Sequence, residues 1–582
     1  MNKFVAKFGQ LVLLFILPFS ATSSPVERVH NFALLDQHGV QHELRKYGDS
    51  KAVVILSTAA SCTENIDLLP KYRLLRTTWE REGVVFLSIA SSSEQRVDDI
   101  RSMDKLYHWD MPILLDDSQL VAEDLGLSKA GQLVVIEPNR LQVLYRGGLD
   151  QELATSNADY ALANVLAVAI ESNLEVVAKT VNRLGGGCEL SFPTKDRHLL
   201  AVPDYAEIVA PILREKCATC HVEGGIAPFA MNSHRMVQGW SPMMREVLMT
   251  KRMPPTQLDP NVKHFDNASY ISAKQMQVLI HWIDAGSPRG KSPADPLTEI
   301  APMKSQWQLG EPDYIVEVPA ITVPATGVLD YENVTINLPF DKEVWVKSVQ
   351  HLPGDNRVLH HLLSFIVPAN YNERIVEGEN DEYREFLEGY APGKEAASTF
   401  PEGSGVGIPK GSAVQMSLHY TPFGKEVVDK TRIGLYFAAE EPEHQYSTYA
   451  LSHGGKNIRI PAGVSDHKMS ASYVFEDEIV LHGLRPHMHY RGKHMRMSVI
   501  YPNGTKADII NVPNYNFAWQ PTYRLTEPMR LPAGSRVLIE GAFDNSEYNL
   551  GNPDPDAVVK GGAQSWDEMF IGYFSYHKAT AI

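Results

Sequence analysis

The first part of the chain, to about residue 185, alternates apolar runs of strand length with segments of helical periodicity. Apolar residues recur at helical spacing from Leu68 to Trp79, and further helices are predicted near 93–106 and 157–172. Strands that alternate with helices indicate an α/β layer. The predicted strands are Ala52–Leu56, Val84–Ile89, Gln132–Ile136 and Gln142–Tyr145.

A second part, about 200–295, carries helical patterns. Ser272 and Gln275 have the spacing of a capping box. The helix that they open places Leu279 and Trp282 on one apolar side and is expected to end near Gly286. Residues 287–296 are rich in proline and small residues, which is typical of a linker.

From about residue 308 to the end, the pattern changes to short alternating strands between Pro/Gly turns, without a long helical period. This pattern favours β-sandwiches, and the length of the segment suggests two, 308–450 and 455–582. Examples of the predicted strands are Tyr314–Val318, Val334–Leu338, Val344–Val349, Ile433–Phe437 and Arg536–Glu540.

Length and charge agree with several folded domains. At about 150 residues per domain, 582 residues predict three to four domains. A hydrophobic content of 44% and a charged content of 21% are ordinary for a soluble globular protein. The formal charge of −16 argues against a nucleic-acid partner, because binding to phosphates needs a basic surface. The predicted fold class is therefore multidomain: α/β, then all-α, then all-β.

The N-terminus has the pattern of an export signal, predicted over residues 1–23. Lys3 and Lys7 precede the apolar run Leu11–Leu17, and Ala21–Ser23 offers small residues for cleavage. An uncleaved membrane anchor is the alternative, but the run is short for a membrane span. We therefore expect export, most simply to the periplasm of a Gram-negative bacterium, with no stable membrane span after cleavage.

The first part resembles a thioredoxin-like redoxin domain, over about 25–185. Cys62 falls at the first strand-to-helix junction, and Tyr145–Asp150 is similar to the redoxin tail pattern. The sequence departs from the family in three ways. Asn65 stands where a thioredoxin has its second cysteine, and Ala59 stands where a peroxiredoxin has threonine. The proline expected opposite the active cysteine is missing from Lys129–Gln132.

Cys62 allows two interpretations. A helix N-terminus lowers a thiol pKa, which favours an active redox thiol. Alternatively, Cys62 pairs with Cys188, because export permits a disulfide and the other two of the four cysteines belong to another motif.

That motif is Cys217–His221, which reads Cys-Ala-Thr-Cys-His. C-x-x-C-H is the attachment pattern of a covalent c-type haem: the two thiols form thioethers, and the histidine is the proximal iron ligand. A zinc or disulfide CxxC followed by an incidental histidine is the alternative. The segment resembles a cytochrome c module of bacterial multidomain oxidases, which implies one haem c. In that resemblance the distal ligand is Met253, in the loop Arg252–Pro255.

Histidines are concentrated in the all-β part. His360 and His361 precede an apolar strand, and a metal shared by adjacent residues requires either a backbone bulge or the use of different ring nitrogens. His487 and His489 are two apart, so on a strand they point to the same face. His419, between these two pairs in the sequence, is the fifth histidine of the set.

This set resembles the copper type II, ascorbate-dependent monooxygenases, namely peptidylglycine α-hydroxylating and dopamine β-monooxygenase. The resemblance rests on His-His before a strand, Leu418-His419-Tyr420, His-x-His and Asp567-Glu568-Met569, in order over about 260 residues. It implies two linked β-sandwiches and two coppers per chain. One copper, for electron transfer, is held by His360, His361 and His419; the catalytic, O₂-binding one is held by His487, His489 and Met569.

Two further residues carry over from the resemblance as substrate contacts. Arg485 matches a position that binds substrate carboxylate in the peptide-amidating members, and Tyr573 matches its hydroxyl partner. The third member of that set is an amide in the family but Ile571 here. A structural salt bridge is the alternative role of Arg485.

The sequence therefore predicts an exported copper monooxygenase that hydroxylates a C–H bond with O₂. Its substrate would be a small organic molecule or peptide, and its electrons would come from a reductant or donor protein through the fused haem. Two other hypotheses remain at this point. One is a copper-binding or copper-sensing protein without turnover, because a scaffold does not imply an activity. The other is a haem/thiol enzyme that handles peroxide.

Overall fold

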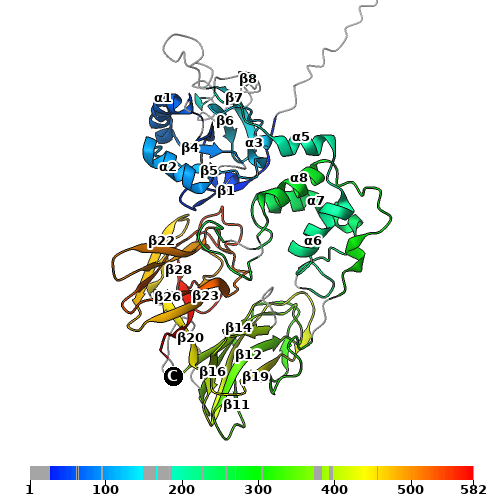
Figure 1. Cartoon of the computed structure of the whole chain (residues 1–582), viewed down its shortest axis with the longest axis vertical. Helices are drawn as coiled ribbons and strands as arrows, with labels where there is room; N and C mark the ends of the chain where they lie inside the picture. The colour runs from blue at the N-terminus through cyan, green and yellow to red at the C-terminus, as the bar shows by residue number, and fades with distance from the viewer. Residues whose placement is uncertain are drawn as a thin grey trace, which may run out of the picture.

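The structure is a computed structural model, and four parts follow one another along the chain (Figure 1). It describes residues 27–580 except 61, 63, 93–95, 149–165, 168–181, 184–186, 226, 256–257, 269, 303–305, 372–382, 392–396 and 455–456. The predicted signal segment, 1–23, and most of the predicted helix 157–172 lie outside the described residues. No helix in the described ranges has the length and apolarity to cross a membrane.

The N-terminal part is built on one six-stranded sheet in the order β5-β4-β3-β6-β7-β8. Its elements are β1 (Ala33–Leu35), β2 (Gln41–Glu43), η1 (Leu44–Tyr47), β3 (Ala52–Thr58), α1 (Glu64–Trp79), η2 (Glu80–Glu82), β4 (Val84–Ala90), α2 (Val97–Tyr107), β5 (Ile113–Leu115), α3 (Leu120–Asp124), β6 (Gln132–Glu137), β7 (Gln142–Gly148) and β8 (Asn182–Arg183). β3 pairs in parallel with β4 and antiparallel with β6. Since β3 is buried on both faces, its run is continuously apolar rather than alternating. The α/β architecture predicted for this part is present.

The helical part packs directly on the first. It contains α5 (Pro193–Leu200), η4 (Tyr205–Val209), α6 (Ala210–Lys216), α7 (His234–Met249), α8 (Ala273–Asp284) and η5 (Pro296–Glu299). The capping box of Ser272 and Gln275 is formed at the start of α8. One apolar cluster continues from Val53 of the sheet to Trp282 of α8, so the two parts share a core.

The proline-rich segment 287–296 lies against these helices. The Trp282 indole donates to the Pro288 carbonyl at 3.0 Å. Asp295 accepts from the Tyr205 hydroxyl at 2.7 Å and from the His234 backbone N–H at 2.7 Å. The segment predicted as a linker is therefore fastened to the helical part rather than spanning free between domains.

The third part is all-β, with two sheets facing each other over one core. Its strands are β9 (Tyr314–Glu317), β10 (Ile321–Val323), β11 (Glu332–Asn337), β12 (Val344–Leu352), β13 (Leu359–Pro368), β14 (Glu385–Tyr390), β15 (Ala397–Thr399), β16 (Ser404–Ile408), β17 (Ser412–Tyr420), β18 (Val427–Asp429) and β19 (Arg432–Phe437). One sheet has the order β11-β17-β13-β14. The facing sheet contributes Val346 and Leu435 to the core, where they meet Leu362 and Leu418. We call this part the first sandwich.

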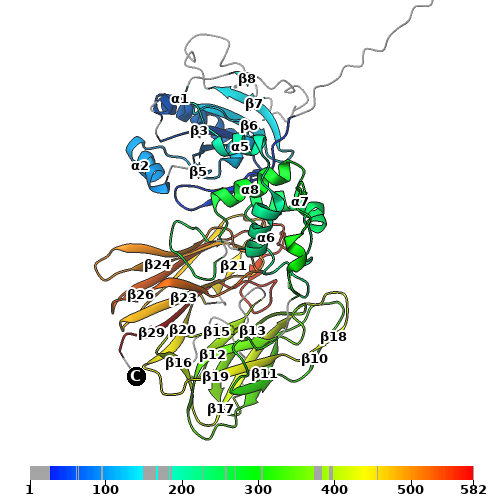
Figure 2. The ribbon, with the colours of Figure 1, turned by 45° about the vertical axis from the view of Figure 1, so that its right-hand side comes forward.

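The fourth part, the second sandwich, repeats this arrangement around a separate core. Its strands are β20 (His444–Ser452), β21 (Arg459–Ile460), β22 (His467–Val474), β23 (Ile479–His487), β24 (Gly492–Ile500), β25 (Lys506–Val512), β26 (Tyr523–Leu531), β27 (Arg536–Phe543), β28 (Val559–Lys560) and β29 (Ile571–Lys578). The sheet β22-β27-β24-β25 faces the sheet that contains β23 and β29. A parallel pairing of β16 with β20 joins the two sandwiches into one nine-stranded sheet, β26-β23-β29-β20-β16-β12-β19-β9 with β15 beside β12 (Figure 2). The all-β architecture predicted for the C-terminal region is therefore present.

Candidate functional site

Three histidines of the first sandwich meet where β13 and β17 pair. His361 lies directly opposite His419, and the register shifts between Leu359 and His361. This irregularity is what allows His360 and His361 to approach the same point, although neighbours on a regular strand face opposite ways. One ring nitrogen from each of the three lies within 4.8 Å of the others.

The imidazoles of this cluster are buried and uncharged. Burial lowers the pKa of His360 to about 4 and that of His419 to about 3, and it lowers the pKa of His361 well below the ordinary value. Among the described residues, the buried atoms His361 Nε2 and His419 Nδ1 have no hydrogen-bond partner. Neutral imidazoles with uncommitted nitrogens are suitable ligands for copper, so the donor set fits the ion that the resemblance implies.

A second histidine pair ends β23 in the second sandwich. The ring centroids of His487 and His489 are 5.2 Å apart. The His489 ring lies 3.1 Å, through Nδ1, from the Asp567 carbonyl. Since a carbonyl only accepts, Nδ1 donates and the lone pair of the neutral ring is on Nε2. His489 Nε2 is buried and has no partner among the described residues. His487 Nδ1 is held by Gln520 Oε1 at 2.5 Å.

Met569 lies two residues before β29, the strand that pairs with β23. The β23–β29 ladder ends at His487 and Ile571, and His489 contacts Asp567 and Glu568, the two residues that precede Met569. The side chain is buried beside Ile571 and Tyr573. The structure thus brings the methionine that sequence reasoning proposed to the same edge of the sheet as the two histidines.

Glu568 fixes the backbone around this pair. Its carboxylate accepts the His489 backbone N–H at 2.9 Å and the Arg491 backbone N–H at 2.6 Å. The group is fully buried, and burial raises its pKa to about 8. By accepting from both backbone N–H groups, Glu568 holds the turn that follows β23 in place. The only signal for it in the sequence was its position inside Asp567-Glu568-Met569.

Arg485 is buried between the sandwiches, and some of its N–H donors have no hydrogen bond among the described residues. It pairs across the ladder with Tyr573, and its guanidinium lies 4.0 Å above that ring and 5.4 Å from the Phe386 ring of β14. Arg485 is only 7% exposed, and its Nε and Nη2 have no partner among the described residues. A Cβ at Gly389 would lie 2.8 Å from Nη1, so β14 approaches the guanidinium closely at this position. No salt bridge involving Arg485 is formed in the described part of the chain.

The two histidine clusters face each other across the junction of the sandwiches. Phe517 lies between them: its ring stacks on His360, with centroids 5.1 Å apart, and meets His489 edge-on at 5.6 Å. The charges of His487 and His489 contribute to lowering the pKa of His361. Phe517 and Gln520 belong to one loop, 513–522, which no sequence pattern marked.

The haem-attachment motif forms a tight turn at the end of α6. The backbone N–H groups of Cys220 and His221 both donate to the Cys217 carbonyl, at 3.2 and 2.9 Å. His221 Nδ1 donates to the Phe229 carbonyl at 3.0 Å, which leaves Nε2 for a metal. Both cysteines are unbonded thiols. The turn, the tautomer of His221 and two unbonded thiols fit a covalent haem.

The structure does not show Met253 beside His221. Met253 follows α7, is 41% exposed, and lines a cavity with Leu248 and Met276. Its assignment as distal ligand rests on the resemblance alone.

Cys62 and Cys188 are joined by a disulfide. The segment around Cys188 pairs with the loop after α3: the Ala130 N–H donates to the Cys188 carbonyl at 2.9 Å, and the Leu190 N–H donates to the Ser128 carbonyl at 2.8 Å. Cys62 is buried. In this state its sulfur is not available as a thiolate, so the paired form of the two alternatives is the one present.

Comparison with known proteins supports the first part of the chain. Residues 25–143 match the AhpC/TSA family. No curated protein matches the chain. Solved structures match about a quarter of the chain. One is a hypothetical protein from Sinorhizobium meliloti, with 18% identity, 28% of this chain and 92% of that chain covered, and a TM-score of 0.24. Another is the thiol:disulfide interchange protein DsbE, described as putative, from Chlorobium tepidum, with 15% identity, 26% and 99% covered, and 0.22. A third is the peroxidoxin BcpB from Mycobacterium tuberculosis, with 20% identity. The match covers 25% of this chain and 96% of that chain, with a TM-score of 0.21.

The family match agrees with the α/β sheet of β3 to β7. The N-terminal part is therefore a thioredoxin-like redoxin domain, which indicates an oxidoreductase type of protein.

Proposed function

We propose that this protein is an exported, copper-dependent monooxygenase that inserts one atom of O₂ into a C–H bond. The observation that carries the proposal is the facing pair of buried clusters, His360 with His361 and His419 on one side and His487 with His489 on the other. Across the two clusters, burial lowers the pKa of His361, His419 and His489, and each of these rings has a buried nitrogen without a hydrogen bond among the described residues. Such a set has no structural use of comparable weight, because each unpaired buried polar atom destabilises the fold.

His360, His361 and His419 would hold one copper, and His487, His489 and Met569 the other. Copper supplies one-electron redox chemistry with O₂, and a thioether ligand favours its reduced state. The chain's own groups do the rest. Gln520 and the Asp567 carbonyl fix the His487 and His489 rings, and Glu568 braces the turn after β23.

Arg485 is the group proposed to orient the substrate. Its unpaired donors lie in a buried position beside Tyr573, on the strand that leads to His487. A carboxylate of a small organic molecule or peptide would satisfy them with charge-assisted hydrogen bonds. The neighbouring Ile571 offers no hydrogen bond, so the carboxylate would be held by fewer side chains than the resemblance implies.

The haem is proposed to supply electrons to the two coppers. A diffusible reductant or a donor protein would in turn reduce the haem. The loop after the attachment motif touches the first sandwich: Asn356 Nδ2 donates to the Gly224 carbonyl at 3.0 Å. Asn356 lies four residues before His360. A donor attached to the same chain acts at a high effective concentration, which suits a reaction that consumes two electrons.

Copper loading and O₂ consumption test this proposal. The haem-containing protein is loaded with copper, and copper content and reductant-driven O₂ uptake are measured over a panel of carboxylates and peptides. We expect two coppers per chain and uptake that falls about 10- to 100-fold in Met569→Leu, the usual range for losing a metal-site group. Met529→Leu, on β26, is the matched control. Absence of uptake over the whole panel would leave copper binding without turnover as the function. Uptake unchanged by Met569→Leu would contradict the proposed catalytic copper site.

The family match of the redoxin domain favours one other candidate, a thiol enzyme that handles peroxide. Peroxide consumption by wild type and Cys62→Ser separates the two. The buried disulfide of Cys62 leads us to expect no difference between them under oxidising conditions.

A further inference from the structure

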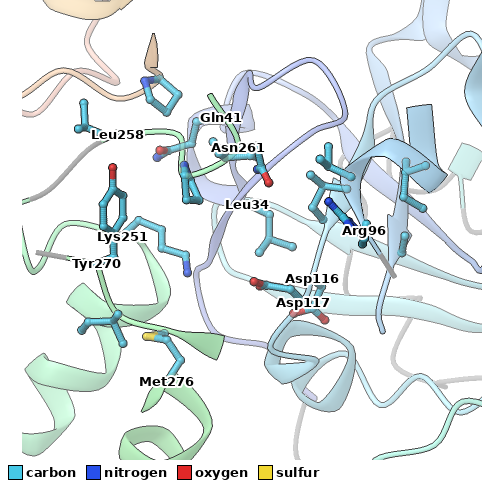
Figure 3. A pocket seen from close by; sticks show the side chains of 18 of the residues that line it. Leu34, Gln41, Arg96, Asp116, Asp117, Lys251, Leu258, Asn261, Tyr270 and Met276 are labelled. Carbon is cyan, nitrogen blue, oxygen red and sulfur yellow. The ribbon is translucent and has the colours of Figure 1, made fainter. Parts of the chain in front are cut away.

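A cavity of about 530 Å³ lies where the redoxin domain, the helical part and the second sandwich meet. Its walls include Leu34 and Gln41 from the first, Lys251 and Tyr270 from the second, and Pro513 from the third (Figure 3). None of the metal-ligand candidates among the histidines lines it. The volume is within the range of small-molecule sites, about 300–1,000 Å³.

The polar groups on one side of this cavity lack partners. Gln41 Nε2 and the Tyr270 hydroxyl are buried atoms without a hydrogen bond in the described structure. Burial raises the pKa of Tyr270 to about 12, so its hydroxyl stays protonated and can donate. Lys251 forms no ion pair within the described residues. All three are donors: Lys251 is exposed, whereas the donor atoms of Gln41 and Tyr270 are buried without a hydrogen bond among the described residues.

Lys251 is also held in an unusual backbone conformation. Its φ of 58° lies in the left-handed region, where glycine or asparagine is favoured after a helix. A lysine there sets the side chain at the helical wall of the cavity, where Figure 3 shows it beside Tyr270.

The acidic groups of the cavity are on the opposite, redoxin side (Figure 3). Asp116 is already saturated: it accepts from the Ser91 hydroxyl at 2.9 Å and from the Ala122 backbone N–H at 2.9 Å. Asp117 is exposed to solvent. The unmet hydrogen-bonding capacity of Gln41 and Tyr270 is therefore donor capacity, and it lies on the side of Lys251, while a second cation, Arg96, lies on the acidic side (Figure 3).

We propose that this cavity binds a small organic carboxylate, with its anionic end on Lys251, Tyr270 and Gln41. The apolar part of the remaining lining would contact the body of the ligand, chiefly through Leu34, Leu258 and Met276. Because the walls come from separate parts of the chain, a bound carboxylate stabilises their mutual arrangement by mass action. The site is independent of the copper chemistry proposed above.

Titration calorimetry on the full-length, haem- and copper-loaded protein tests the site. Phenylacetate is the probe, and phenylacetamide is its uncharged counterpart. We expect phenylacetate to bind, phenylacetamide to bind at least about tenfold more weakly, and Lys251→Met to lose about tenfold in phenylacetate affinity. Tyr270→Phe, which keeps the ring, should lose a few-fold. Lys274→Met, an exposed lysine of α8 outside the cavity, should leave affinity unchanged.

Arg485 is also proposed to bind a carboxylate, so phenylacetate could bind there instead. Repeating the titration with Arg485→Met distinguishes the two sites. Binding that persists there and is lost in Lys251→Met supports the cavity. Binding that disappears in Arg485→Met and is unaffected by Lys251→Met places the probe at the histidine junction and overturns the inference. Equal affinity for acid and amide, or no heat for either, overturns it as well. The haem absorption spectrum of each variant checks that the fold is retained.

Discussion

The Phe517 ring of the second sandwich stacks on the His360 ring of the first, with centroids 5.1 Å apart and planes inclined by 20°. The same phenyl group meets His489 edge-on at 5.6 Å. Three residues along, Gln520 holds His487. One loop therefore contacts both histidine clusters and sets how the two sandwiches close on each other.

Replacing Phe517 by leucine keeps an apolar side chain but removes the ring contacts with His360 and His489, and a third with Tyr490. We expect unfolding of the all-β region to become easier by about 1–2 kcal/mol, since each aromatic pair contributes about 0.5–1.5 kcal/mol beyond buried area. Copper content should stay at two per chain, because the proposed ligands remain. O₂ uptake should fall, because the two histidine clusters are held together less firmly. Calorimetry, copper analysis and O₂ uptake measure these effects. Phe423→Leu, an exposed phenylalanine, is the control; equal behaviour of the two variants would contradict the bridging role.

Replacing Arg485 by methionine should stabilise the ligand-free protein. Two buried, unpaired donors cost about 1–3 kcal/mol each, whereas the contact with the Tyr573 ring contributes about 2 kcal/mol. The balance favours the variant by up to about 4 kcal/mol, which calorimetry would detect as a higher melting temperature. Carboxylate-bearing substrates should lose their advantage over the matching amides in O₂ uptake.

Arg432→Met serves as the control for Arg485, because Arg432 is exposed and also lies over an aromatic ring, Trp307. A markedly less stable Arg485→Met would show that the guanidinium is satisfied within the fold and has no vacancy for a ligand.

The contrast between the loop and the histidines shows what the sequence could predict. The ligands could be proposed because histidine and methionine carry their chemistry at any position, and His487 and His489 fall on one face of a strand by spacing alone. Phe517 is an ordinary apolar residue, and its role depends on a contact with His360, which is 157 positions earlier in the chain. Such a contact leaves no periodic signal. Local spacing therefore predicts ligands but not the groups that bring two domains together.

Element prediction succeeded where the pattern was long. Strands such as β3 and β4 are seven residues each and continuously buried, whereas β5 has three residues and α3 five, too short for periodicity to register. The segment 287–296 was interpreted as a linker because proline and small residues are typical of linkers. Its side chains and carbonyls in fact meet partners on α7 and α8, which composition does not reveal.

Asn356→Ala tests the proposed route of electrons. The variant loses the bond to the Gly224 carbonyl, and one hydrogen bond of about 0.5–1.5 kcal/mol corresponds to a change of about threefold to tenfold in a rate that depends on it. We expect reoxidation of the reduced haem by O₂ in copper-loaded protein to slow by that factor, followed by rapid-mixing absorbance. Asn503→Ala, on a turn of the second sandwich, should not change the rate. A rate unaffected by Asn356→Ala would mean that electrons do not pass at this contact.

Asp124 ties the redoxin domain to the helical part, and its contribution should depend on pH. The carboxylate accepts the His30 backbone N–H at 2.8 Å, lies 2.6 Å from His30 Nδ1, and accepts from Arg245 at 3.3 Å. Burial alone would raise its pKa, but these hydrogen bonds and charges outweigh burial and hold the pKa below the ordinary 3.8. A carboxyl group with a lowered folded-state pKa stabilises the fold above its unfolded pKa, and this stability is lost as the pH falls through the folded value.

Asp124→Asn should therefore cost about 1.5–3 kcal/mol at pH 7, the usual range for a hydrogen bond to a charged group. The difference from wild type should persist down to about pH 5 and shrink below about pH 4, as the wild-type carboxylate takes up its proton. Urea unfolding followed by tryptophan fluorescence at pH 7, 5 and 3.5 measures this. Asp117→Asn, an exposed neighbour of the same domain, should show no such loss. If the difference in unfolding free energy between wild type and Asp124→Asn at pH 3.5 equals that at pH 7, the charge of Asp124 does not contribute to stability.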